Sequence, residues 1–511
     1  MADYDVIIIG ANTPALITAA YLGKEAGLKT LIVEKSNFVG ASAMTVEMTP
    51  GFKFHPAATG EYCVHPKLEH DFGMSKYGLE RIPCEPTLTT SFGDGKYMSL
   101  YYDVEQTTEE IAKYSAKDAK AYGPWMKNWL KIGELYGMAQ INEAPSMAQF
   151  IGSMSANPEM EFLCRDMLFG TVRDCLDNIF ESDYVKAAFL TLNEGASLGP
   201  SGASFFFNIG RILAPWGFIR GGLGKLSEVL EKVANDHGAE IKRNAEVIKI
   251  LTKNGEAYGV KTKDGAEITA KYAVLSELEW PKTFNELTDN ADDLPAIFRK
   301  GLREIRYECG GVTLNLALDK LPDFGFPEDR YKGMFGISKP GYRYFEEAYA
   351  AYNLNIIPEH MCAMTYMPSY IEPGFFAPEG KHVLTAYAFP INYYIDKDWK
   401  NGGKEELLEK WINSLNEFAP GLKDSVIYAN GYSPKELEEK FGMTNGDLGH
   451  GTLRWYSELS FRPFPGYSKY RVPIKNLYMG GQSTHPLSGV GGIGGYNVAM
   501  AILKDNKLVK K

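Results

Sequence analysis

The residues best suited to chemistry stand at the first turn of the chain. Gly10, Asn12 and Ala15 have the spacing of a Gly-x-Gly-x-x-Gly turn, and Glu34 follows about twenty residues later. In such a turn the backbone approaches a pyrophosphate at the start of a helix, while the acid accepts hydrogen bonds from a ribose diol. The pattern indicates a dinucleotide site, and the start of any other βαβ unit is the alternative interpretation.

The turn departs from the full motif at two positions. Ala15 is tolerated, because the third position governs the close packing of helix on strand. Asn12 matters more, because the second glycine normally lets the backbone approach the pyrophosphate with no side chain in the way. Asparagine tolerates unusual backbone angles, and its amide is itself able to donate to a phosphate oxygen. Two interpretations therefore remain for Asn12: its side chain obstructs the pyrophosphate, or its amide binds a phosphate oxygen in place of the close backbone approach.

Two strands and a helix must position this turn. Residues 5–9 form a continuously apolar, β-branched run, which is typical of a buried parallel strand. Residues 16–22 carry apolar side chains at helical spacing after Pro14, whose fixed φ suits a first helical turn. Gly27 ends the predicted helix, and residues 28–33 form the second strand, which leads into Glu34.

Two later segments complete the predicted nucleotide-binding sheet. A glycine-rich turn over 219–226 leads into a helix over 226–237, and strands follow, over 239–241, 244–250 and 272–275. A strand over 477–479 then precedes the glycine-dense residues 480–495 and a last helix, over 496–503. Free N–H groups at a glycine-dense helix start bind anions, which suits the pyrimidine end of a reduced flavin. A flexible glycine linker is the alternative for this segment.

Length, charge and cysteine usage restrict the classes of protein to which the chain can belong. A chain of 511 residues exceeds the roughly 250–300 at which single cores stop growing, so two domains are expected. The net charge of −10, without a basic cluster, argues against nucleic acid as a partner. No apolar run approaches the length of a membrane span, and the first strand begins too early for a signal peptide. The six cysteines are scattered and the histidines lack ligand spacing, which favours free thiols in the cytoplasm and argues against a metal.

Several stretches in this order resemble one family. The resemblance is to the FAD-dependent phytoene-desaturase-type oxidoreductases of the amine-oxidase-like flavoprotein superfamily, nearest to the branch of pyridine nucleotide-disulfide oxidoreductase domain-containing protein 2. It runs nearly from end to end of the chain and is carried by residues 10–34, 39–41, 50–54, 118–122, 220–224, 244–247, 450–451, 462–466 and 484–486. The resemblance implies an α/β fold, a Rossmann-type FAD-binding domain assembled from discontinuous segments, and an α+β substrate-binding domain.

The resemblance also implies which residues bind FAD. Gly10, Asn12 and Ala15 would hold the pyrophosphate, Glu34 the adenosine ribose, and the backbone of Val247 would flank the adenine. The other implied cofactor-binding residues lie along the ribityl path or near the isoalloxazine: Lys35, Gly40, Ala41, Ser42, Gly481, Val490, Gly491 and Gly492. Three positions depart from the family pattern, because Asn12 and Ala41 replace glycines and Gln482 replaces an acid that many relatives carry. Such changes would weaken the binding of FAD, or would mark a site that no longer catalyses a reaction.

The predicted domains alternate along the chain. The FAD-binding segments are 1–75, 217–280 and 465–511, and the substrate-domain segments are 76–216 and 281–464. Aromatic residues are numerous in the substrate segments, where they serve either as core or as walls of an apolar pocket. The candidate walls are Phe205, Phe206, Phe207, Trp216, Tyr366, Tyr370, Tyr387, Phe389, Tyr393 and Tyr394.

Three ionisable residues are candidates for the chemistry. His485 stands just before the glycine run that would face the flavin, and His450 precedes Gly451 in a loop-like stretch. A histidine titrates near neutral pH and suits a base that removes a proton while flavin N5 takes hydride. A structural, hydrogen-bonded histidine is the alternative for each. Arg454 is a candidate to hold a substrate carboxylate or carbonyl, or else stacks on Trp455.

These observations predict an FAD-dependent dehydrogenase or desaturase. Its substrate would be an apolar isoprenoid, alicyclic or long-chain molecule, oxidised across a C–C bond. A flavin-dependent isomerase or saturase, and a catalytically quiet FAD-binding interaction protein, are the alternatives. With only one dinucleotide fingerprint, electrons would pass to an external acceptor: a quinone, oxygen or a partner protein. A cytoplasmic location is expected, with peripheral membrane contact and homo-oligomerisation left open.

Overall fold

The structure is a computed structural model that describes residues 2–61, 64–155, 157–192, 217–289, 293–487 and 489–508. Its first sheet combines strands from both ends and the middle of the chain. Five parallel strands run in the order β9-β2-β1-β12-β18, and β10 and β11 extend β12 as an antiparallel meander. The strands are β1 (Tyr4–Ile9), β2 (Thr30–Val33), β9 (Ala239–Lys242), β10 (Val247–Lys253), β11 (Glu256–Thr262), β12 (Glu267–Ser276) and β18 (Leu477–Met479).

Both faces of this sheet are buried, as the apolar run of β1 predicts. Val6 and Ile8 pack on the face that is covered by three helices, α1 (Thr13–Ala26), α10 (Leu223–Asp236) and α17 (Ile493–Asp505). Ile7 and Ile9 face the other side, which packs on the aromatic residues after β12 and on α12 (Ala296–Glu304). The alternation follows from the two-residue period of a strand. Gly27 has φ 65° and ends α1, as predicted.

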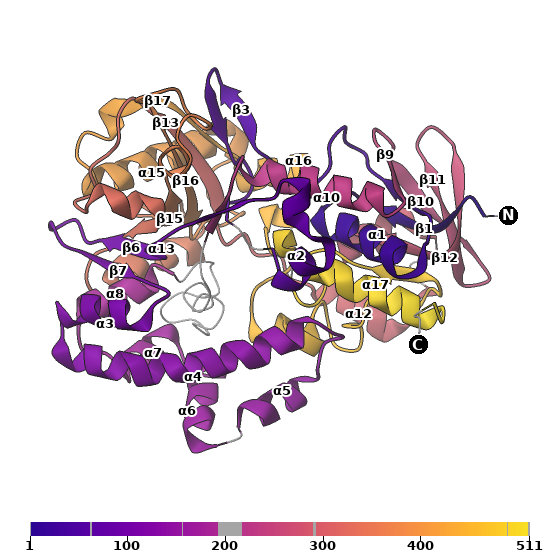
Figure 1. Cartoon of the computed structure of the whole chain (residues 1–511), viewed down its shortest axis with the longest axis horizontal. Helices are drawn as coiled ribbons and strands as arrows, with labels where there is room; N and C mark the ends of the chain where they lie inside the picture. The colour runs from indigo at the N-terminus through magenta and orange to yellow at the C-terminus, as the bar shows by residue number, and fades with distance from the viewer. Residues whose placement is uncertain are drawn as a thin grey trace.

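A second, larger core surrounds a mostly antiparallel sheet. Its strand order is β17-β13-β16-β15-β14-β6-β7, and only β14 and β6 pair in parallel. The strands are β6 (Leu88–Ser91), β7 (Tyr97–Leu100), β13 (Val312–Leu318), β14 (Met334–Ile337), β15 (Cys362–Tyr366), β16 (His382–Phe389) and β17 (Val426–Gly431). Figure 1 shows the two sheets side by side, with the N-terminus and α17 at the end of the molecule that holds the first sheet.

Most remaining helices accompany the second sheet. Figure 1 shows α4 running along one edge of the molecule, with α5 and α6 projecting beyond it. These helices are α3 (Val104–Ala112), α4 (Ala116–Gln140), α5 (Met147–Met154), α6 (Pro158–Leu168), α7 (Val172–Asp177), α8 (Asp183–Leu190), α13 (Arg343–Asn353), α15 (Lys404–Phe418) and α16 (Pro434–Phe441). Within the described residues no helix combines the length and the apolar character that crossing a bilayer requires.

Smaller elements connect the two sheets. Helix α2 (Pro66–Phe72) packs beside α1, and two short pairs are formed by β3 (Val46–Thr49) with β4 (Phe52–Phe54) and by β5 (Arg81–Pro83) with β8 (Gly217–Ile219). Five cysteines are buried free thiols, and Cys63 lies outside the described residues. The mixed architecture confirms the predicted fold class, while the domain boundaries stay predictions.

Candidate cofactor and substrate site

One cavity of about 650 Å³ opens where β1, β2 and β12 end and extends to the second sheet. It brings together residues that are far apart in sequence, as expected at the carboxyl ends of parallel strands. The predicted residues that line it are Gly10, Asn12, Glu34, Lys35, Gly40, Ala41, Ser42, Val247 and His450. Ala15, Gly481, Gly491, Gly492 and His485 lie outside this lining, and the side chain of Val490 is not among those described.

The first turn positions Asn12 as the N-cap of α1. Gly10 has φ 93°, which favours glycine, whereas Asn12 has an ordinary extended backbone with φ −73°. The Asn12 Oδ1 accepts a hydrogen bond from the Ala15 N–H at 2.9 Å, and Nδ2 lies 3.5 Å from the carbonyl oxygen of Glu277. The asparagine therefore needs no unusual backbone angle, and its amide oxygen is engaged by the helix.

Glu34 stands at the end of β2, where the resemblance places the ribose. Its Oε2 accepts from the Ala11 N–H and its Oε1 from the Ser36 N–H, each at 2.8 Å. Because a carboxylate has about four acceptor positions, two of these bonds leave capacity for a ribose diol. The hydrogen bonds also hold the carboxylate in the cavity lining before any ligand arrives.

The turn at Gly40 and Ala41 closes the cavity against α10. A Cβ at Gly40 would lie 1.9 Å from Ser227 Oγ, which itself donates to the Ala43 carbonyl at 2.7 Å. Ala41 adopts a left-handed φ of 51°, a region in which glycine carries no steric penalty. The structure thus accommodates the alanine that replaces the second glycine of the family pattern, at the cost of a strained φ.

The C-terminal glycines act mainly through packing. A Cβ at Gly492 would lie 2.0 Å from Ile17 Cδ1, so this glycine allows α17 to approach α1 closely. The Thr13 Oγ1 donates to the Gly489 carbonyl at 3.2 Å and joins the starts of the two segments. Gln482, Ser483, Leu487 and Gly489 line the cavity, and they form its C-terminal wall.

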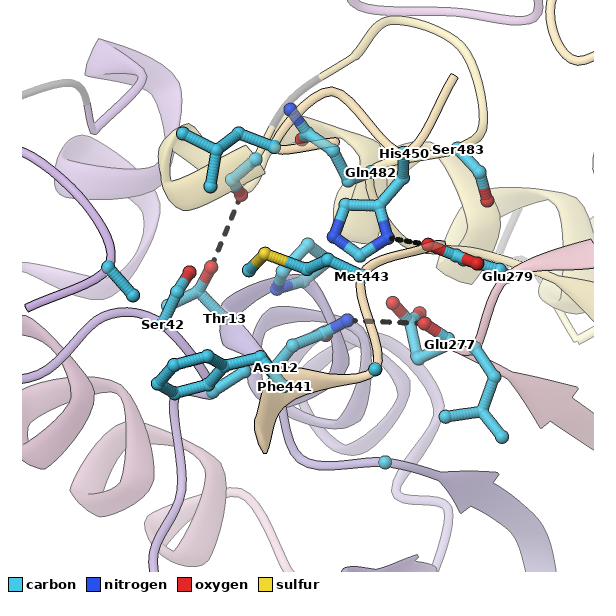
Figure 2. A pocket seen from close by; sticks show the side chains of 18 of the residues that line it. Asn12, Thr13, Ser42, Glu277, Glu279, Phe441, Met443, His450, Gln482 and Ser483 are labelled. Atoms are coloured by element: carbon cyan, nitrogen blue, oxygen red, sulfur yellow. Dashed lines mark hydrogen bonds and ion pairs between the residues drawn. The ribbon is translucent and has the colours of Figure 1, made fainter. Parts of the chain in front are cut away.

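Glu277 is a cavity residue that the sequence reasoning missed. It follows β12 directly, and neither carboxyl oxygen has a hydrogen-bond partner although both are buried. Burial raises the pKa of this carboxyl to about 8, against a smaller opposing effect of Asn12. Figure 2 shows Asn12 and Glu277 pointing toward one another across the cavity. An acid that directly follows a buried strand was the available signal.

His450 forms an ion pair deeper in the same cavity. Its Nδ1 lies 3.0 Å from Oε1 of Glu279, whose side chain is 1% exposed and also accepts from the Thr444 N–H. Burial acts to raise the pKa of Glu279, but the hydrogen bond and charge of His450 outweigh it and the pKa is lowered. In Figure 2 the His450 ring lies beside Met443, and its second nitrogen points away from Glu279. The arrangement resembles the oriented histidines of general-base catalysis.

Arg454 forms an ion pair with an acid that lines the cavity. Its guanidinium forms a two-pronged ion pair with Glu308, with NH2–Oε1 at 3.0 Å and Nε–Oε2 at 3.2 Å. The guanidinium carbon also lies 5.8 Å from the centre of the Tyr456 ring. The role of Arg454 in holding a substrate and its stacking on Trp455 stay predictions. Because Glu308 lines the cavity, the pair leaves no net charge on this part of the wall.

His485 is buried beside the end of α4. The His485 Nε2 lies 2.9 Å from the Ala139 carbonyl oxygen near the end of α4. The Tyr470 hydroxyl donates a hydrogen bond to the backbone carbonyl of His485. Burial lowers the pKa of its imidazole to about 4. This position agrees with the structural alternative for His485, and its catalytic role stays a prediction.

The aromatic candidates are divided between core and cavity. Tyr387 lines the cavity, while Tyr366 and Phe389 are fully buried in the core of the second sheet. Tyr370 and Tyr393 are partly buried at its margin and Tyr394 is 61% exposed. Phe205, Phe206, Phe207 and Trp216 lie outside the described residues.

The cavity residues fit FAD. Glu34 stands where a ribose diol binds, the start of α1 where a diphosphate binds, and the unpartnered oxygens of Glu277 and Gln482 await polar partners. The cavity that these residues line has a volume of about 650 Å³.

Comparison with known proteins supports this assignment. The family described as flavin containing amine oxidoreductase matches residues 16–276. Relatives include pyridine nucleotide-disulfide oxidoreductase domain-containing protein 2 of Rattus norvegicus, 28% identical over 99% of this chain and 94% of the relative. A limonene dehydrogenase chain from Castellaniella defragrans is 26% identical over 98% and 94%, and a phytoene desaturase of Fusarium fujikuroi is 24% identical over 98% and 89%.

Solved structures share the fold. An oxidoreductase from Methanosarcina mazei superimposes with a TM-score of 0.58 at 18% identity, over 98% of this chain and 99% of that one. Cyclohexylamine oxidase from Brevibacterium oxydans has a TM-score of 0.55 at 16% identity, over 99% and 100%. The predicted resemblance, the fold class and the cofactor FAD are confirmed.

Proposed function

Because the chain belongs to the flavin containing amine oxidoreductase family and is an FAD-dependent oxidoreductase, we propose that it dehydrogenates a C–C bond of an uncharged, apolar substrate. The names of two relatives, a limonene dehydrogenase chain and a phytoene desaturase, support an isoprenoid or alicyclic substrate. Reducing equivalents would leave to an external acceptor, which is a quinone, oxygen or a partner protein.

The observation that carries this proposal is the charge balance of the inner cavity. Glu308 is neutralised by Arg454, and Glu279 by Lys282, which lies 3.6 Å away. The remaining wall toward the second sheet includes Gly310, Thr313, Tyr387, Leu448 and Leu453. Asp447 also lies there, and its carboxylate accepts from three backbone N–H groups, those of Glu308, Gly449 and Gly451. Salt bridges hold Glu308 and Glu279, and backbone N–H groups hold Asp447, so these acids are already engaged, whereas an apolar substrate would bury its surface against the apolar wall residues.

His450 is the proposed proton acceptor. Glu279 holds the Nδ1 side of the ring, so the other nitrogen is directed toward the cavity and is the one able to take a proton. Phe441 and Met443 line the same cavity and add apolar surface near the imidazole. FAD, when bound, supplies the acceptor for the hydride that leaves the neighbouring carbon.

Anaerobic flavin reduction tests the proposal. The purified holoenzyme is mixed with a cyclic monoterpene, an acyclic polyene isoprenoid, a long-chain acyl compound or a primary amine, and bleaching of the yellow colour is followed. Bleaching by one of the first three supports dehydrogenation, and bleaching only by the amine contradicts it. A product formed without bleaching indicates an isomerase. Neither product nor bleaching with any compound favours the catalytically quiet protein.

A variant of His450 tests the proton acceptor. His450→Gln should retain FAD and slow flavin reduction by roughly 10²–10⁴, the usual contribution of a general base. His360→Gln is the matched control, because this histidine has a side chain that is 43% exposed and pairs with Glu417 on the surface. Reduction of the His450 variant at the control rate would exclude the role.

A further inference from the structure

The first turn offers few backbone donors to a diphosphate. The Ala11 N–H is engaged by Glu34 and the Ala15 N–H by the side chain of Asn12, while Pro14 has no N–H. Among residues 11–15 this leaves the N–H groups of Asn12 and Thr13. A diphosphate is an acceptor only, so a third donor at this place would restore binding that the altered turn has lost.

Glu277 is the unpartnered polar group nearest to this place. The residue is 7% exposed, its two carboxyl oxygens are buried without partners, and it lines the same cavity as Gly10 and Asn12. The Glu277 carboxyl also packs against Gly480, the residue that follows β18, because a Cβ at Gly480 would lie 2.2 Å from the Glu277 Oε1. The carboxyl therefore lies between the first turn and the C-terminal wall, beside the Asn12 amide but without a hydrogen bond of ordinary geometry at either oxygen.

We propose that the Glu277 carboxyl, in its protonated form, donates a hydrogen bond to the diphosphate of bound FAD and so replaces a backbone donor of the altered turn. A carboxylate in this position would repel the diphosphate and remain desolvated, whereas the neutral acid supplies one donor and one acceptor. The inference concerns cofactor binding alone and does not depend on the substrate proposed above.

The charged groups around Glu277 do not offer it another partner. Glu34, at the end of β2, accepts from two N–H groups, and Glu279 is held by His450 and by Lys282, 3.6 Å away. Asn12, at the start of α1, is the polar side chain that faces Glu277, and Gly480 and Gly481 contribute backbone only. Burial raises the pKa of Glu277 to about 8, so the free protein holds the proton at neutral pH.

The proposal gives a definite sign to the pH dependence of FAD binding. Above pH 8 the free protein loses the proton that the complex requires, so the Kd for FAD should rise by about tenfold per pH unit. A carboxylate that instead accepted a bond from a ribityl hydroxyl would give a Kd that falls over the same interval.

The test is a titration of full-length apoprotein with FAD, followed by quenching of flavin fluorescence from pH 6.5 to 9.5. Glu277→Gln keeps a neutral donor, so its Kd should stay within about threefold of the wild-type value at pH 7 and stay flat to pH 9.5. Glu286→Gln, an exposed acid at the cavity rim, is the matched control and should keep the wild-type slope. A wild-type Kd that is flat or falls with pH, or equal slopes for wild type and Glu277→Gln, overturns the proposal.

A measurement on the wild type alone guards against a variant that fails to fold. Calorimetric titration at pH 9 in buffers of different ionisation enthalpy counts the protons taken up on binding. Uptake of about one proton per FAD supports the proposal, because Glu277 would be mostly ionised in the free protein at that pH. No uptake, or release, overturns it. Since neither experiment requires turnover, failure to find a substrate leaves both results interpretable.

Discussion

Substitution of Glu34 by alanine should impair both the apoprotein and the cofactor complex. The carboxylate accepts two N–H groups at 2.8 Å, and the residue that carries one of them, Ala11, is 1% exposed. An orphaned buried N–H costs about 1–3 kcal/mol, whereas the partly exposed Ser36 N–H can be rehydrated. We therefore expect Glu34→Ala to lower the free energy of unfolding of the apoprotein by about 2 kcal/mol.

The same variant should bind FAD less tightly. Each hydrogen bond from a ribose hydroxyl to a carboxylate contributes roughly 1.5–3 kcal/mol, so the Kd should rise by about tenfold or more. Urea unfolding of apoprotein and fluorescence titration with FAD measure the two effects. Glu240→Ala is the matched control, because its ion pair with Lys29 is 4.0 Å long and both side chains are more than half exposed. Wild-type unfolding together with wild-type affinity in Glu34→Ala would refute the reasoning.

Three further outcomes are expected. Acid precipitation should release all yellow colour into the supernatant, since FAD is expected to bind without a covalent link, and colour in the pellet would contradict this. Asn12→Gly should leave the affinity for FAD unchanged or improve it. The free energy of unfolding should fall by only a few tenths of a kcal/mol, because glycine is itself an acceptable N-cap. Loss of cofactor in this variant would show instead that the Asn12 amide binds phosphate. His485 has its pKa lowered to about 4 by burial, so wild-type stability should fall as pH drops from about 6.5 toward 4, and His485→Gln should lack this component. FAD-replete His485→Gln should be reduced at nearly the wild-type rate, and a reduction slower by roughly 10²-fold would restore His485 as the base.

The local elements of the cofactor domain were predictable from the sequence. The apolar run of β1, the helix that ends at Gly27 and the strand that leads to Glu34 each carry a local signal, and all three are present. The last helix begins at Ile493, three residues before the predicted start, because the glycines that favour a loop locally are accepted where α17 packs on α1. Local propensity yields to tertiary packing at such positions.

The site itself was only partly predictable. Individual residues such as His450 can be selected by type, but the pairing of His450 with Glu279 joins segments that the strand order alone brings together. Glu277 escaped notice because its importance comes from burial without a partner, which is a property of the folded surroundings. His485 stood at a favourable place along the chain, yet α4, which is distant in sequence, provides its hydrogen-bond partner.

The pairing of β12 with β18 has a consequence for the order of assembly during synthesis. The inner half of β12 lies between β1 and β18, and the wall residues Gln482, Ser483, Leu487 and Gly489 follow β18. A nascent chain that has not yet released this segment from the ribosome leaves an open strand edge and an incomplete cofactor cavity. Flavin loading therefore has to follow the synthesis of β18 and the wall residues, and the stabilisation that a bound ligand provides is gained only by chains in which β18 has docked.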